Sequence, residues 1–133
     1  MSTNAQKEKE KDAIVKKFNN LVRRLLKCVD NVIDDPELER LRMAANQAIT
    51  VNDLFAVSRV GPYFFRYKEQ IFAGNIEYFL NDDLGEDTHE VDDIISKVRM
   101  AWYKCNDDER TVLYDIIHEL TTLYIEYVLL EKS

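Results

Sequence analysis

Residues 107–131 carry the clearest pattern of hydrophobic and polar positions in the chain. At about 100° per residue, apolar side chains cover one wide arc of a helix and acidic side chains cover a narrow strip opposite. So wide an arc indicates a helix that is covered on more than one side, so we expect this helix to be the most buried. The arc consists of Leu113, Ile116, Ile117, Leu120, Leu123, Tyr124, Tyr127, Val128 and Leu130.

Polar residues mark where this helix begins. Asn106 can cap it, and Asp107, Asp108 and Glu109 place negative charge in its first turn, where the helix dipole favours it. Apolar residues at helical spacing predict another helix over residues 88–103. Because the connection between the two helices is short, we expect a C-terminal antiparallel helical hairpin.

The N-terminal part of the chain has a second amphipathic pattern, which predicts a helix from Asp12 onward. Its apolar face consists of Ile14, Phe18, Leu21, Val22, Leu25, Cys28, Val29 and Val32. The opposite face is basic and consists of Lys16, Arg23, Arg24 and Lys27, with Lys17 at its border. Residues 1–11 are polar, and we expect them to form a flexible N-terminus.

Shorter helices are predicted between these two patterns. Asp35 as a cap followed by Pro36 predicts a helix over residues 36–48, and Asn52 can cap a third over residues 53–60. The break at residues 61–62, Gly-Pro, leads into a helix that ends before Gly74, and Asn75 caps one or two further turns.

Residues 63–72 should be structural. We expect Phe64, Phe65 and Ile71 to be mostly buried, because they are the large apolar side chains of this segment. The charged residues between them, Arg66, Lys68 and Glu69, should face solvent.

These elements predict an all-α fold, a single compact domain of five or six helices over residues 12–133. The chain has 133 residues, which suits one domain with a real core. It contains 3 glycines and 2 prolines, too few for the turns of a β-rich fold.

Charge and cysteine content indicate which partners and which cellular compartment to expect. The net charge of −7 argues against bulk nucleic-acid binding, although residues 1–27 hold eight basic and three acidic side chains. Cys28 and Cys105 lie at apolar helix positions and are interpreted as small buried side chains in a reducing compartment, with a disulfide as the alternative. No signal peptide or membrane span is visible, so we expect an intracellular location or the inside of an assembled particle.

The acidic loop at residues 81–90 invites a calcium interpretation. An EF-hand needs oxygen ligands at alternating positions, a glycine at the sixth and a glutamate at the twelfth. Starting from Asp83 places Gly85 third and Thr88 sixth, and starting from Asn81 places Gly85 fifth. Neither register fits, so the loop is interpreted as solvated and as the cap of the next helix.

Other catalytic patterns are equally weak. Both histidines follow an acid by three residues, in the pairs Glu86/His89 and Asp115/His118, which is the spacing used by di-metal carboxylate bundles. Two further inward glutamates are missing, and Asp115 lies on the polar strip. No nucleophile elbow or phosphate loop occurs. We therefore predict no enzyme activity, no cofactor and no metal site.

Two surfaces remain as candidates for binding. The basic face of the first helix, Lys16, Lys17, Arg23, Arg24 and Lys27, is either an ordinary solvated face or a site for an acidic protein, nucleic acid or acidic lipid. A stripe outside the main arc of the last helix is either covered by a neighbouring helix or an interface. This candidate interaction stripe consists of Tyr114, His118, Ile125 and Leu129.

One segment has a recognisable motif. Residues 63–71 read Tyr-Phe-Phe-Arg-Tyr-Lys-Glu-Gln-Ile and residues 77–83 read Glu-Tyr-Phe-Leu-Asn-Asp-Asp. Together with Trp102 and the closing helices, they resemble small uncharacterised helical proteins of nucleocytoplasmic large DNA viruses. The chain departs from that pattern at residues 75–76, Asn-Ile, where acidic residues are expected. The resemblance implies a viral source, with no catalytic residue.

The leading functional hypothesis is a non-enzymatic protein-interaction or scaffolding module, which the resemblance would place in a virion or virus factory, or in the host cytoplasm or nucleus. The first alternative is a phosphate-binding module that uses the basic face on nucleic acid or acidic lipid. The second alternative is a metal-dependent enzyme. A protein partner or self-association is expected under the leading hypothesis.

Overall fold

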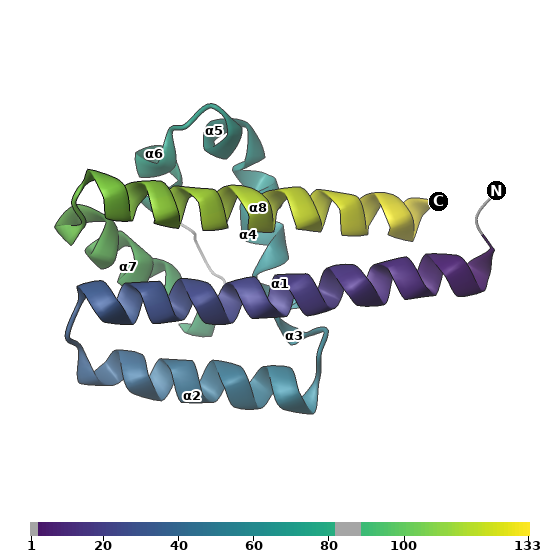
Figure 1. The fold of residues 1–133 in the computed structure, drawn as a ribbon, viewed down its shortest axis with the longest axis horizontal. Helices are drawn as coiled ribbons and strands as arrows, with labels where there is room; N and C mark the ends of the chain where they lie inside the picture. Colours follow the sequence, from purple (N-terminus) through teal and green to yellow (C-terminus); the bar gives the residue numbers. More distant parts are fainter. Residues whose placement is uncertain (1–2, 82–88) are drawn as a thin grey trace.

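The computed structural model describes residues 3–81 and 89–133, with side chains from residue 93 onward in the second range (Figure 1). Within these ranges there are eight helices and no strand, which confirms the all-α class. This is more than the five or six helices expected. Four of the eight helices, α3 to α6, are short. The helices are α1 (Asn4–Val32), α2 (Pro36–Val51), α3 (Phe55–Arg59), α4 (Gly61–Arg66), α5 (Lys68–Phe72), α6 (Ile76–Asn81), α7 (His89–Lys104) and α8 (Asp107–Lys132).

The centre of the fold is the antiparallel pair α1 and α8, which run side by side in opposite directions in Figure 1. Phe18 and Leu26 of α1 and Ile117 and Leu120 of α8 are fully buried. Burial is therefore shared between the two long helices, and α8 is not the single most buried element. The hairpin predicted for the last two helices is not confirmed, since the extensive antiparallel partner of α8 is α1.

The first helix begins earlier than the sequence predicted. Thr3 caps it by accepting a hydrogen bond from the backbone N–H of Gln6 at 3.1 Å, and α1 is helical from Asn4. The predicted start at Asp12 was therefore wrong. Within these polar first turns Lys11 pairs with Glu131 near the end of α8, a contact that no local pattern reveals.

The α2 start signal is confirmed. The Asp35 side chain accepts a hydrogen bond from the backbone N–H of Glu37 at 3.0 Å, and Pro36 occupies the first turn. Leu38 and Ile49 are buried, and the backbone N–H of Asn52 closes the helix on the carbonyl of Ala48. The buried side chains pack α2 along α1.

The aromatic segment after Gly61 forms two short helices where the sequence predicted one. α4 and α5 meet at Tyr67, whose φ of −107° and ψ of 19° interrupt the helix. Gly74 then ends α5 with a positive φ of 83°, and Asn75 caps α6 through Tyr78 N–H. The glycine stop and the asparagine cap are both confirmed.

Gly61 allows α4 to approach α8 closely. A Cβ atom at this position would lie 2.1 Å from Cδ1 of Tyr124, well inside van der Waals contact. The absence of a side chain is therefore what lets the Tyr124 ring lie against the α4 backbone.

Burial within α4 corrects one expectation. Phe64 and Ile71 are buried, as predicted, but Phe65 is 37% exposed. Consecutive helical residues point about 100° apart, and the buried side of α4 includes Tyr63 and Phe64 but ends before Phe65. Phe65 instead lies at the edge, with its ring 6.0 Å from that of Tyr124 and 4.2 Å from the Lys68 ammonium.

The junction between α7 and α8 confirms the predicted cap. Asn106 Oδ1 accepts from the backbone N–H of Glu109 at 2.8 Å, and the Glu109 carboxylate accepts from the backbone N–H of Asn106 at 3.0 Å. This reciprocal pair is a capping box. It fixes where α8 begins and therefore how its apolar arc is aligned with α1.

Candidate interaction surfaces

The structure divides the candidate interaction stripe into two halves. In the first half, the Tyr114 hydroxyl donates to the carbonyl oxygen of Ile71 at 2.9 Å, and the His118 ring lies 4.9 Å from the Phe72 ring. Both Tyr114 and His118 are half-buried. This half therefore holds α5 against α8 and is not an open surface.

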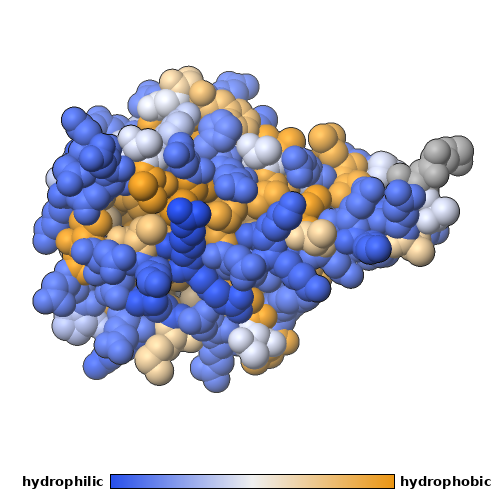
Figure 2. Space-filling model, viewed as in Figure 1, coloured by the Kyte–Doolittle hydropathy of each residue, from blue (hydrophilic) through white to orange (hydrophobic). Residues whose placement is uncertain are grey.

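The second half of the stripe lies near the end of α8. Ile125 is half-buried, whereas Leu129 is 63% exposed. Figure 1 shows that α1 and α8 here extend beyond the helices that cover their middle. We call this extension, residues 4–17 of α1 with residues 125–132 of α8, the arm. Figure 2 shows apolar surface continuing from the rest of the molecule toward this narrow end.

A shallow groove runs between the two helices of the arm. Its apolar lining comes from Ile14 of α1 and Leu129 and Leu130 of α8. Charged side chains border it, and they are Glu10 and Lys17 of α1 and Glu126 of α8. The structure thus places Leu129 of the predicted stripe and Lys17 of the predicted basic face in one groove.

Sequence reasoning missed the α1 side of this groove. Glu10, Ala13, Ile14 and Lys17 are spaced at i, i+3, i+4 and i+7, which places them on one side of a helix. That spacing was a usable signal, but it begins within residues 1–11, which were interpreted as a flexible terminus.

The outer end of the arm is fastened by polar contacts. Lys11 Nζ lies 2.6 Å from a carboxylate oxygen of Glu131 and 5.6 Å from the centre of the Tyr127 ring, and Lys7 donates to the carbonyl oxygen of Ser133. The hydrogen bond between Lys11 and Glu131 raises the pKa of Lys11 and lowers the pKa of Glu131. Both groups therefore stay charged across the neutral range.

The predicted basic face is mostly open. Lys16, Lys17, Arg24 and Lys27 are exposed. Arg23 differs, because its Nε donates to Oδ1 of Asn46 in α2 at 2.8 Å and it is half-buried. Arg23 therefore belongs to the contact between α1 and α2, and the remaining four cations form the accessible face.

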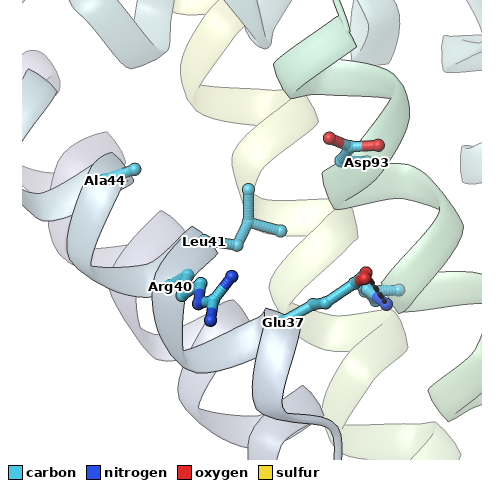
Figure 3. A pocket seen from close by; sticks show the side chains of 6 residues that line it. Glu37, Arg40, Leu41, Ala44 and Asp93 are labelled. Atoms are coloured by element: carbon cyan, nitrogen blue, oxygen red, sulfur yellow. Dashed lines mark hydrogen bonds and ion pairs between the residues drawn. The ribbon is translucent and has the colours of Figure 1, made fainter.

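A polar cleft lies between α2 and α7 (Figure 3). Lys97 pairs there with Glu37 at 3.4 Å and, more closely, with Asp35. The hydrogen bond from Lys97 lowers the pKa of Asp35, and the same contact raises the pKa of Lys97. Figure 3 shows Asp93 pointing into the cleft apart from this pair. The ion pairs bridge the α2 start to α7, so their evident role is structural.

Groups for catalysis do not converge in the described part of the chain. Among the described residues, no three His, Cys, Asp or Glu side chains are grouped to hold a metal ion. Cys28 and Cys105 are free thiols, and burial raises the pKa of Cys105, which disfavours the reactive thiolate. The acidic loop considered for calcium and the Glu86/His89 pair lie largely outside the described residues.

Comparisons with known proteins found no similar protein. No protein-family model, curated protein or solved structure matches the chain. The resemblance to small proteins of large DNA viruses therefore stays a prediction. Among the described helices, none is both long and apolar enough to cross a membrane.

Proposed function

We propose that this protein is a non-enzymatic interaction module that binds a protein partner through the arm. The observation that carries the proposal is the 63% exposure of Leu129 beside a groove lined by Ile14 and Leu130. Exposed apolar groups that lie together in a groove with a charged border are characteristic of docking surfaces.

The division of the predicted stripe supports the same location. Tyr114 and His118 are occupied by contacts with Ile71 and Phe72, so they have little surface to offer a partner. Leu129 has no such cover. A helical partner lying along the groove would bury Leu129, and buried apolar anchors supply most of the affinity of helix-in-groove complexes.

A pair of matched variants tests this proposal. Leu129→Glu places a charge in the groove, while Val51→Glu places the same charge at an exposed apolar residue of α2, outside the arm. Both variants should keep the helical circular dichroism of the wild type, because neither side chain is buried. Affinity capture from cells that make the protein should then recover its partner with wild type and Val51→Glu, and lose it with Leu129→Glu.

Two results would count against docking through the arm. If folded Leu129→Glu retains the same partner, the interface lies elsewhere. If wild-type protein captures no other protein and also does not self-associate, the interaction-module proposal itself fails.

A phosphate-binding module remains a second candidate because Lys16, Lys17, Arg24 and Lys27 are exposed along one helix. Binding of this kind releases counterions, so affinity for DNA or for anionic vesicles should fall steeply as salt rises. The test is to titrate DNA or anionic vesicles with wild type and, separately, with the double variant Arg24→Gln/Lys27→Gln, in low and in high salt. Equal binding by both proteins excludes the basic face as a phosphate site.

A further inference from the structure

We infer that the occupant of the arm groove is the arm of a second copy of this chain, so that two arms form an antiparallel four-helix bundle. This inference rests on the proposed function and names the partner. Each arm is a pair of antiparallel helices with one apolar groove. A four-helix bundle consists of two such pairs, in which each helix gains a second neighbour and the apolar groups lie at the centre.

The order of charges along α1 identifies a second copy as the complementary occupant. Glu10, Ala13, Ile14 and Lys17 lie along one side of the helix, with the acid at one end and the base at the other. A two-fold axis between Ala13 and Ile14 would bring Glu10 of each copy opposite Lys17 of the other. One symmetry operation therefore creates two opposite-charge pairs, which is the self-complementarity that an isologous interface requires.

These charges are available for contacts between copies. Glu10 and Lys17 are exposed, and neither takes part in an ion pair within the described residues. Their neighbour Lys11 differs, because it is already paired with Glu131 on the other side of α1. A strongly acidic or strongly basic partner fits less well, since the groove border presents Glu10 and Glu126 together with Lys17.

The apolar side chains supply the affinity of the contact. Leu129 is largely exposed and Ile14 and Leu130 are half-buried, so pairing two arms removes apolar surface from water in both copies. The groove spans about two helical turns of α1, roughly 10 Å. A contact of this length buries less area than a standard interface of about 800 Å² per partner, so we expect a weak dimer with Kd between about 1 µM and about 1 mM.

Charge reversal tests the pairing directly. Glu10→Lys places lysine opposite Lys17 at both ends of the interface, and Lys17→Glu places glutamate opposite Glu10. Each variant alone should weaken dimerisation by about tenfold in sedimentation equilibrium at low salt. An equimolar mixture of the two variants restores both opposite-charge pairs, so it should form a heterodimer with affinity close to that of the wild type.

Lys27→Glu is the matched control, because it makes the same charge change at an exposed lysine of α1 that lies outside the arm. It should leave the dimer unchanged and should not restore association when mixed with Glu10→Lys. The Leu129→Glu variant should also be more monomeric than the wild type, while its circular dichroism stays helical.

Three outcomes overturn the inference. One is a wild type that stays monomeric up to about 1 mM. Another is a dimer insensitive to Glu10→Lys and Lys17→Glu, and the third is a mixture that stays monomeric. A monomeric wild type whose captured partner is lost in Leu129→Glu would overturn the second copy as occupant and leave the interaction module standing.

Discussion

The arm and the rest of the molecule, which we call the body, use the same two helices in different ways. In the body, α1 and α8 are enclosed by α2 to α7, and Phe18, Ile117 and Leu120 are fully buried. In the arm, all of whose residues are described, Val15 is the one buried side chain. Polar contacts such as Lys11 with Glu131 hold its end together.

This difference separates what stabilises the fold from what is left for binding. Buried apolar area dominates folding free energy, whereas an exposed ion pair contributes about 0–1 kcal/mol. The body therefore carries most of the stability. The arm can change its surface with little loss of stability, which is the condition that an evolving docking surface needs.

The largest expected effect is in the body. Phe64→Ala should lower the free energy of unfolding by about 3–5 kcal/mol, because it empties a fully enclosed site beside Phe18 and Phe79. Its neighbour Phe65 is 37% exposed, so Phe65→Ala should cost only about 1 kcal/mol. Urea denaturation of both variants measures the contrast, and equal losses would show that the two sides of α4 are equally enclosed.

The second prediction concerns the close approach of α4 to α8. Gly61→Ala should cost about 1–3 kcal/mol, because its Cβ atom would lie 2.1 Å from the ring of Tyr124. The cost should shrink in a Tyr124→Ala background, where the ring is absent. A double-mutant cycle measures this coupling, and additive losses would mean that the clash is relieved elsewhere.

Local signals made part of the fold predictable. Asp35, Asn106 and Gly74 each act within a few residues, so their sequence context was sufficient to place helix ends correctly. The apolar arc of α8 was likewise readable, since its spacing is a property of one helix. These features account for the all-α class and for most long-helix boundaries.

Long-range contacts were not predictable in the same way. Which of Phe64 and Phe65 is buried depends on the direction from which α8 approaches α4. The sequence left Tyr114 open between a covered position and an interface, because its partner, the Ile71 carbonyl oxygen, lies far away in the chain. The contact between Lys11 and Glu131 was not predictable for the same reason, because the two residues meet only after α1 and α8 pair.

A smaller effect is expected from removing the side-chain caps at the start of α8, in the body, and at the start of α1, in the arm. Asn106→Ala removes the side-chain acceptor at the start of α8 and should cost about 1 kcal/mol of global stability. Thr3→Ala removes the equivalent acceptor at the start of α1, but in the arm it should mainly let the first turn fray. Denaturation should detect the first loss, and amide hydrogen exchange near Gln6 should detect the second. A global loss of 1 kcal/mol or more from Thr3→Ala would mean that the arm folds as one unit with the body.

The smallest predicted effect concerns the pH dependence of the arm. A hydrogen bond to Lys11, and a second hydrogen bond to Tyr127, lower the pKa of Glu131 below its usual 4.5. The hydrogen bond to Glu131 raises the pKa of Lys11 above its usual 10.5. The stabilisation of the arm should therefore be complete between these two usual values. It should be lost as pH falls through the lowered pKa of Glu131, and again as pH rises through the raised pKa of Lys11.

Carbon-13 NMR of the Glu131 carboxyl group can follow the acid limb of this dependence, with amide exchange over residues 125–132 reporting the opening of the arm. Lys11→Met should move the pKa of Glu131 back toward its usual value, although the Tyr127 hydrogen bond should retain part of the shift. Asp35 provides the internal control, because its pKa is lowered by Lys97 in the body and should not respond to Lys11→Met. If Glu131 titrates normally in the wild type, the ion pair does not hold the arm closed. Apolar contact between α1 and α8 would then have to hold the two helices of the arm together.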